Sequence, residues 1–128
     1  MVSGGIGSGG NAYNSVEILH ANGTSYCTLP DLPDIRYWHT QDGLRACGGD
    51  ANGTHDNCVS LTDGQWKQSR ILLHDRREHT SWALGDGGVV LMGGIDSGNT
   101  TEIISPGSFT TTEGFTLKYN TGYNFYKI

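Results

Sequence analysis

The chain has 128 residues, enough for one ordinary domain, and a formal net charge of -5. Only 8 residues are Lys or Arg, which argues against nucleic acid as a partner, because phosphate binding needs clustered cations. No apolar run approaches the roughly 18 residues of a membrane helix, so no membrane partner is expected either. The 20 glycines are spread along the chain as turn punctuation, which favours β structure.

The N-terminal stretch MVSGGIGSGG has neither a charged n-region nor an apolar h-region, so it does not resemble a signal peptide. Three glycosylation sequons nevertheless occur, at Asn22, Asn52 and Asn99, each where a loop or turn is expected. Together with three cysteines, these sequons predict an extracellular or secreted protein. The sequence would then be a mature form or a fragment.

One pattern occurs three times along the chain: an apolar run that ends in a pair of glycines. The pairs are Gly4-Gly5, Gly48-Gly49 and Gly93-Gly94. Their first members lie 44 and 45 residues apart. A second landmark, Arg-x-x-His, occurs as Arg36 to His39 and again as Arg76 to His79, 40 residues later. Independent landmarks with nearly the same period indicate an internal repeat.

Each period is predicted to contain four short strands joined by hairpin turns, because its apolar runs are too short for helices and rich in β-branched residues. In the second copy the strands are expected at 37–41, 44–48, 57–62 and 65–72. In the third copy they are expected at 79–84, 88–93, 100–105 and 108–118. Four-stranded repeats near 45 residues indicate an all-β chain that forms part of a β-propeller. A β-solenoid is the alternative, although its coils are usually shorter.

The motifs resemble those of the kelch-repeat β-propeller family. The resemblance rests on GGIGSGGNAYNSVEIL (residues 4–19), on LPDLPDIRYWHT (29–40) and on Trp66 in the second copy. It implies that each glycine pair closes the second strand of a blade, and that the residues after Arg-x-x-His form the innermost strand. It also implies that the tryptophan packs between blades and that the glycine pairs, arginines and histidines are scaffold residues. The third copy departs from the pattern, with Phe109 in place of the tryptophan.

The chain is long enough for about three four-stranded blades, whereas a propeller has four to eight. Blade 1 is expected at about 1–33, blade 2 at about 34–75 and blade 3 at about 76–118, with a spare terminal strand at about 119–128. Blade 1 lacks its innermost strand, so the propeller is predicted to be incomplete as a single chain.

The spare strand predicts a homo-oligomer. Its aromatic residues are Tyr119, Tyr123, Phe125 and Tyr126. If this strand completes blade 1 of a partner, two chains form a six-bladed ring, and a rotation that does not close forms a filament. The alternative is that the sequence is a fragment of a longer propeller.

The cysteines predict one disulfide. Cys47 and Cys58 fall on adjacent strands of blade 2, on either side of the loop after the glycine pair, which is close enough for a bond if the register agrees. Cys27 is then left over, either buried or paired between chains. The closely spaced Cys or His pairs of a zinc site do not occur, and no metal or other cofactor is expected.

Acid–base catalysis has only a weak candidate pair, Asp31 and Asp34, which lie in a proline-rich connection and are interpreted as turn residues. His55 lies in a loop near two aspartates, where a solvated loop is favoured over a weak metal site. The chain is therefore predicted to be a non-enzymatic extracellular structural or binding protein that assembles with copies of itself.

A ligand-binding propeller is the alternative function. Tyr37, Trp38 and Trp82 would then bind a glycan or a protein near the channel. Exposure of these aromatic side chains would favour this alternative, and Trp66 is expected to be packed more closely than Trp38.

Overall fold

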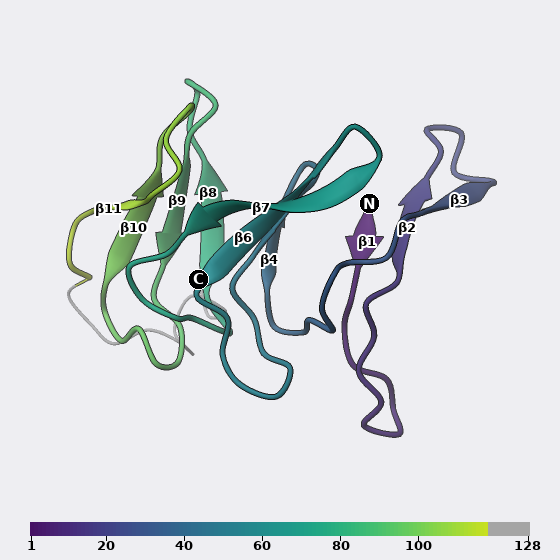
Figure 1. Cartoon of the computed structure of the whole chain (residues 1–128), viewed down its shortest axis with the longest axis horizontal. Coiled ribbons are helices and arrows are strands. Elements are labelled where there is room, and N and C mark those ends of the chain that lie inside the picture. Colours follow the sequence, from purple (N-terminus) through teal and green to yellow (C-terminus); the bar gives the residue numbers. More distant parts are fainter. Residues whose placement is uncertain (118–128) are drawn as a thin grey trace.

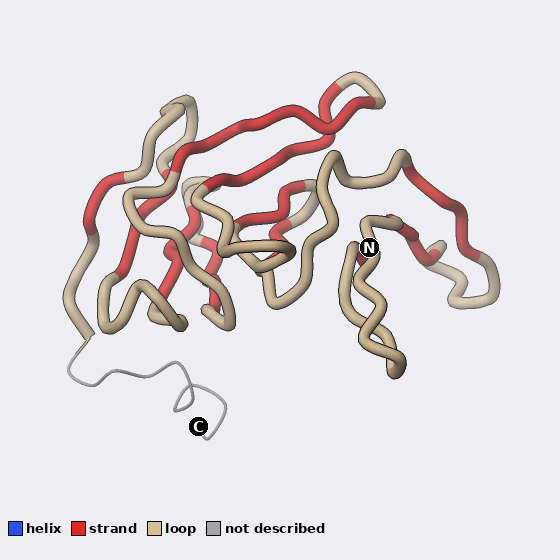
Figure 2. The backbone as a smooth tube through the Cα atoms, turned by 60° about the horizontal axis from the view of Figure 1, so that its bottom comes forward, coloured by secondary structure: helices blue, strands red, loops and turns tan. Residues whose placement is uncertain are grey.

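The structure, a computed structural model, describes residues 1–117. This part of the chain contains eleven strands and no helix (Figure 2), so the all-β prediction is confirmed. The strands form three antiparallel sheets that lie side by side in chain order (Figure 1). Within the described residues, no helix is long and apolar enough to cross a membrane.

Each sheet is a meander in which strands that are neighbours in sequence are also paired in space. Sheet 1 contains β1 (Val2–Ser3), β2 (Val16–Leu19) and β3 (Tyr26–Leu29). Sheet 2 contains β4 (Thr40–Asp42), β5 (Arg45–Cys47), β6 (Asn57–Thr62) and β7 (Gln65–Ile71). Sheet 3 contains β8 (Thr80–Ala83), β9 (Val89–Met92), β10 (Thr101–Ile104) and β11 (Thr112–Glu113). The first strands of sheets 2 and 3, β4 and β8, contact each other.

The first strand of sheet 2 begins later than the sequence predicts. The predicted strand covers 37–41, whereas β4 begins at Thr40. Trp38 adopts a left-handed backbone conformation, with φ of 55°, and Glu78 does the same in the next repeat, with φ of 52°. The Arg-x-x-His segment is therefore a tight turn that precedes the strand.

The last strand of sheet 3 is also shorter than the predicted range of 108–118. Before β11 begins, the chain bonds to the end of β7 instead of to β10: Ile71 N donates to Phe109 O (3.1 Å), and Thr111 N donates to Ile71 O (3.3 Å). This segment links sheet 3 to sheet 2. The other strands predicted in the second and third copies agree with the structure to within one residue at each end.

The core consists of two apolar clusters, one on each face of sheet 2. The cluster toward sheet 1 contains Val16, Leu32, Ala46 and Val59, with Trp66 packed against it. The cluster toward sheet 3 contains Cys47, Cys58, Leu72, Val89, Leu91 and Ile104. Because successive residues of a strand point to opposite faces, Ala46 and Cys47 of β5 contribute to different clusters. Sheet 2 is thus covered on both faces.

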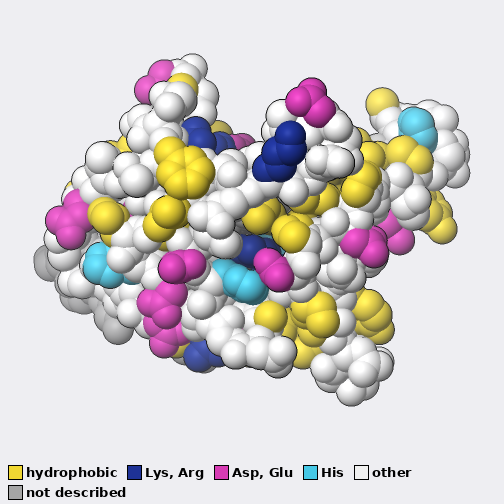
Figure 3. Space-filling view, in the orientation of Figure 1, with side chains coloured by type: hydrophobic (Ala, Val, Ile, Leu, Met, Phe, Trp, Pro, Cys, Tyr) yellow, Lys and Arg dark blue, Asp and Glu magenta, His cyan; other side chains and the backbone are white. Residues whose placement is uncertain are grey.

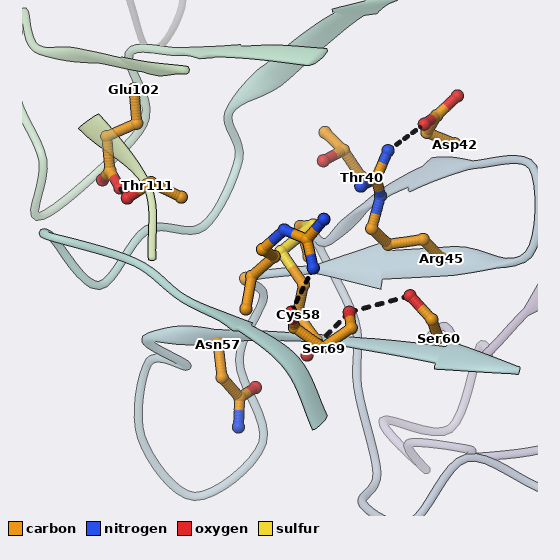
Figure 4. Close-up of a disulfide and its surroundings, with 12 residues drawn as sticks. Thr40, Asp42, Arg45, Asn57, Cys58, Ser60, Ser69, Glu102 and Thr111 are labelled. Carbon is orange, nitrogen blue, oxygen red and sulfur yellow. Dashed lines mark hydrogen bonds and ion pairs between the residues drawn. A yellow bond between two sulfur atoms is a disulfide. The ribbon is translucent and has the colours of Figure 1, made fainter. Parts of the chain in front are cut away.

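The Cys47–Cys58 disulfide is present in the structure, as the sequence predicts. The two cysteines are directly opposite each other on β5 and β6, and both are buried in the cluster between sheets 2 and 3. Figure 4 shows Cys58 in sheet 2 near the centre of the view and Glu102 and Thr111 at the upper left. Cys27 is exposed on β3 and is a free cysteine, so the option that it is buried is wrong.

We expect loss of the disulfide to destabilise the protein. In Cys47→Ala/Cys58→Ala, a cross-link that spans 11 residues is lost, and a loop of about this size contributes about 3 kcal/mol to the free energy of unfolding. Urea unfolding of the oxidised proteins measures the difference. The matched control, Cys27→Ser, removes an exposed thiol and should change the free energy by less than about 0.5 kcal/mol. Equal stability of the double variant and the wild type would contradict a structural role for the bond.

Candidate functional site

Repeated residues make several of the contacts that join neighbouring sheets. The backbone N–H of Gly5 donates to Arg36 O (2.8 Å), and the N–H of Gly49 donates to Arg76 O (2.8 Å). In each case a glycine pair of one sheet binds the turn that leads into the next sheet. The first glycine of each pair leaves room for that turn, since a Cβ at Gly48 would lie 2.4 Å from Arg76 O.

The arginine side chains bind the opposite way, into the sheet that follows their turn. Arg36 is fully buried; its Nη1 donates to Gly48 O (2.6 Å) and its Nη2 to Asn57 Oδ1 (2.9 Å). Burial lowers the pKa of Arg36 to about 10, while the charge of Asp34 opposes this shift, so the guanidinium stays charged at neutral pH. Its carbonyl binds sheet 1 and its guanidinium binds sheet 2, which makes the residue a cross-link.

Arg76 makes the equivalent cross-link between sheets 2 and 3. It is also fully buried, and its Nη1 donates to Gly93 O (2.9 Å) and its Nη2 to Thr100 Oγ1 (3.2 Å). The same Nη2 lies 2.7 Å from Oε1 of Glu102 in a fully buried ion pair. This second interface therefore contains a buried ion pair, and the described residues form no equivalent pair in the first interface.

Glu102 is held by four donors on one carboxylate. Besides Arg76, it accepts hydrogen bonds from the backbone N–H groups of Leu73 (2.7 Å) and His74 (3.0 Å) and from Thr111 Oγ1. Burial alone raises the pKa of Glu102, but the hydrogen bonds from Thr111, Leu73 and Arg76 together lower it below its ordinary value. The carboxylate thus ties the linker between sheets 2 and 3 to β10.

A histidine adds a further link across each interface. Nε2 of His39 lies 3.0 Å from Ser3 Oγ of sheet 1, and Nε2 of His79 lies 2.8 Å from Thr40 Oγ1 of sheet 2. Burial, followed by the charges of the neighbouring arginines, lowers the pKa of His39 to about 4 and of His79 to about 3. Both imidazoles are therefore neutral at neutral pH.

Near the turn before β4, Arg77 joins two loops. It forms ion pairs with Asp50 and Asp96, the latter at 3.2 Å, and its guanidinium lies 5.8 Å from the centre of a Trp38 ring. Tyr37 packs edge-on against Trp38, with ring centres 4.8 Å apart. The cluster contains charged and aromatic groups, but no nucleophile paired with a base.

An open groove of about 520 Å³ lies between the linker before Arg36 and the loop at 51–55. Asn14, Ile35, Asn52 and His55 are among the side chains that line it. Burial is the main cause that lowers the pKa of His55. Within residues 1–117, no three His, Cys, Asp or Glu side chains are close enough to hold a metal ion.

The remaining predicted residues lie as follows. Asn22, Asn52 and Asn99 are exposed in turns or loops, and Trp66 is half-buried with its Nε1 donating to Pro30 O (2.7 Å). Trp38 and Trp82 are 46% and 68% exposed. The residues predicted for an assembly strand, Tyr119, Tyr123, Phe125 and Tyr126, lie outside the described residues.

The sequence interpretation identified the arginines and histidines but missed the groups that bind them. Asn57, the first residue of β6, and Thr100, the residue before β10, occupy equivalent places and could have been found by aligning the repeats beyond their glycines. The sequence did not indicate a role for the threonine that follows each histidine, although Thr40 Oγ1 forms a hydrogen bond with His79 Nε2. No protein-family model matches this sequence, and no curated protein matches it at a significant level.

We expect Gly48→Ala to destabilise the protein more than Gly64→Ala. Both glycines have left-handed backbones, with φ of 62° and 74°. A Cβ would collide with Arg76 O at Gly48, whereas a Cβ at Gly64 would meet no neighbouring atom. The backbone strain should cost about 1–2 kcal/mol at each site, and displacement of the Arg76 turn should cost about 1–3 kcal/mol more at Gly48. Urea unfolding compares the two variants. Equal losses would show that close approach of the sheets does not depend on Gly48.

We expect stability to fall as the pH drops below about 6.5. The unfolded histidines bind protons near their ordinary pKa of 6.5, whereas His39 and His79 resist protonation until about pH 4 and 3. The contribution of each histidine to the free energy of unfolding is therefore complete above pH 6.5. Below that pH it falls by up to about 1.4 kcal/mol per pH unit. The pKa of Glu102 is lowered in the folded protein, so the stability that this carboxylate contributes is lost at more acidic pH than that of the histidines.

Urea unfolding at a series of pH values measures this slope. His39→Gln should reduce the slope between pH 6.5 and 4.5, and His20→Gln, which changes an exposed turn residue, should not. A wild-type free energy that is constant over this range would contradict neutral buried histidines.

Proposed function

We propose that this chain forms three consecutive blades of a kelch-type β-propeller and acts as a non-enzymatic structural or binding protein outside the cell. The observation that carries the proposal is the repeated cross-link between sheets. Two successive interfaces use a glycine pair, a buried arginine and a neutral histidine at equivalent positions. A repeated link of this kind places each sheet against the next in the same way, which is how a propeller is built.

The extracellular location is supported by the disulfide and by the sequons. Disulfides persist in oxidising compartments, and the Cys47–Cys58 bond is buried in the core. Asn22, Asn52 and Asn99 are exposed, as glycan acceptors must be.

Self-assembly is the role that we propose for the open end of this stack. The outer face of sheet 1 exposes Val2, Leu19 and Tyr26, and hydrophobic side chains are visible on that end of the molecule (Figure 3). Exposed apolar sheet faces and unpaired edges favour association with another chain. Two chains would form a six-bladed ring, or several would form a filament, with residues 119–128 exchanged between copies. The alternative is a module of a longer propeller that binds a protein or a glycan.

A glycan-binding role is the second candidate, and the exposure of two tryptophans favours it. Trp38 is exposed beside Tyr37 and Arg77, which provide an aromatic surface with hydrogen-bonding groups around it. Trp82 is exposed on β8 of sheet 3.

We expect sedimentation velocity to show a dimer or a larger assembly at micromolar concentration. Leu19→Lys places a charge in the exposed face of sheet 1 and should shift the distribution toward the monomer, because a charge would be buried in the contact. Leu44→Lys, at an exposed turn between β4 and β5, is the matched control and should assemble normally. A stable, compact wild-type monomer would contradict self-assembly, and normal assembly after deletion of 119–128 would contradict strand exchange.

A further inference from the structure

Among residues 1–117, no strand pairs with the edge of β1 at the position where sheets 2 and 3 each have one. In sheet 2, the strand that leads to the glycine pair, β5, is paired along this edge with β4, and Thr40 is opposite Cys47. In sheet 3, the corresponding strand is covered by β8, with Thr80 opposite Met92. In sheet 1, β1 leads to the glycine pair itself, and among the described residues it pairs only with β2. The position that β4 and β8 occupy is therefore open beside Ser3.

The two repeated histidines, His39 and His79, bond to different strands of the preceding sheet. His79 meets a hydroxyl on the first strand of the preceding sheet, Thr40 of β4. His39 meets Ser3 of β1 instead, because sheet 1 has no such strand in the described part of the chain. Ser3 Oγ also donates to Gln41 Oε1 (2.7 Å), and Gln41 Nε2 donates to Met1 O (3.1 Å). His39 and Gln41 thus bond directly to Ser3 of β1 and to the preceding Met1.

Glu17 occupies the place in sheet 1 that Glu102 occupies in sheet 3. Glu102 is opposite Leu91, two residues before a glycine pair, and Glu17 is opposite Val2, two residues before another. Glu102 is fully buried and binds a guanidinium and two backbone N–H groups. Glu17 is exposed, and its carboxylate has no hydrogen bond or ion pair with any of residues 1–117.

The apolar residues around Glu17 follow the same equivalence. Val2 and Leu19 are 70% and 61% exposed, whereas the corresponding Leu91 and Ile104 of sheet 3 are 0% exposed. Leu91 and Ile104 are covered by Leu72, which belongs to the linker that carries Arg76. The outer face of sheet 1 therefore has the acceptor and the apolar surface of a sheet interface, but no linker from residues 1–117 packs against it.

We propose that the free edge of β1 and the outer face of sheet 1 bind a strand from another polypeptide with the pattern Leu-x-x-x-Arg-x-x-His-Thr. Its arginine binds Glu17 and the carbonyl of Gly4, and its threonine lies opposite Ser3. This partner continues an established interface, since both linkers of this chain have the pattern, from Leu32 to Thr40 and from Leu72 to Thr80. Its affinity comes from strand addition and from charge-assisted hydrogen bonds to the carboxylate.

This inference rests on the proposed propeller but differs from strand exchange by the terminal segment. Residues 119–128 contain no arginine and no histidine. They can supply a strand but not the arginine contact that the position of Glu17 calls for. The two occupants are therefore distinguishable by their dependence on Glu17.

The test uses a fluorescent peptide with the sequence of residues 72–83, LLHDRREHTSWA, and the full chain at a concentration below its self-association. We expect saturable binding by fluorescence anisotropy and at least about tenfold weaker binding to Glu17→Gln, because a charged hydrogen bond is lost. Glu113→Gln, at an exposed strand position of sheet 3, is the matched control and should bind normally. The peptide with Arg76→Ala should bind the wild-type chain more weakly by the same factor. It should bind Glu17→Gln as weakly as the unchanged peptide does, because the contact is already lost.

Two outcomes would overturn the inference: no binding of the 72–83 peptide, or binding that Glu17→Gln leaves unchanged. Tighter binding of a 119–128 peptide, insensitive to Glu17→Gln, would identify the terminal segment as the occupant and leave self-assembly standing. Binding of the 72–83 peptide to a chain that sediments as a monomer would support the inference and contradict self-assembly.

Discussion

The arrangement of the three sheets depends on a buried arginine at the turn between one sheet and the next. Its carbonyl accepts a hydrogen bond from the glycine pair of the preceding sheet, and its guanidinium binds the following sheet. Burial of a charged group is costly unless its donors are paired. Because the acceptors lie at the ends of the two central strands of the following sheet, the requirement that Arg36 and Arg76 be paired fixes the position of each sheet.

The two interfaces contain different additional contacts, which makes them unequal. Among residues 1–117, Arg36 binds only neutral acceptors, whereas Arg76 also binds the Glu102 carboxylate. The disulfide lies on the sheet 3 side of sheet 2, and the segment before β11 adds backbone hydrogen bonds to Ile71. Sheets 2 and 3 therefore form the more strongly connected pair, and sheet 1 is held by fewer kinds of contact.

The sequence was sufficient to predict the all-β class, most strand boundaries and the disulfide, because each depends on local pattern and on the spacing of the repeats. It was not sufficient for the turn at Trp38, since a left-handed backbone is uncommon for tryptophan and its own preference would not predict it. Nor did it identify Glu102 as an acceptor, because its donors come from residues far away in the sequence. Contacts of this kind become visible only when the repeats are compared in three dimensions.

The exposed face of sheet 1 differs from an ordinary exposed surface, because its positions correspond to a buried interface elsewhere in the chain. An exposed valine or leucine is ordinary on a protein surface. Val2, Glu17 and Leu19, however, share a register with residues that are completely buried in sheet 3. In sheet 3, the carboxylate in this register is the acceptor for Arg76, and in sheet 2 the strand beside β5 carries the hydroxyl that meets His79. The partner that we propose for the exposed face of sheet 1 therefore carries residues that the same chain already uses elsewhere.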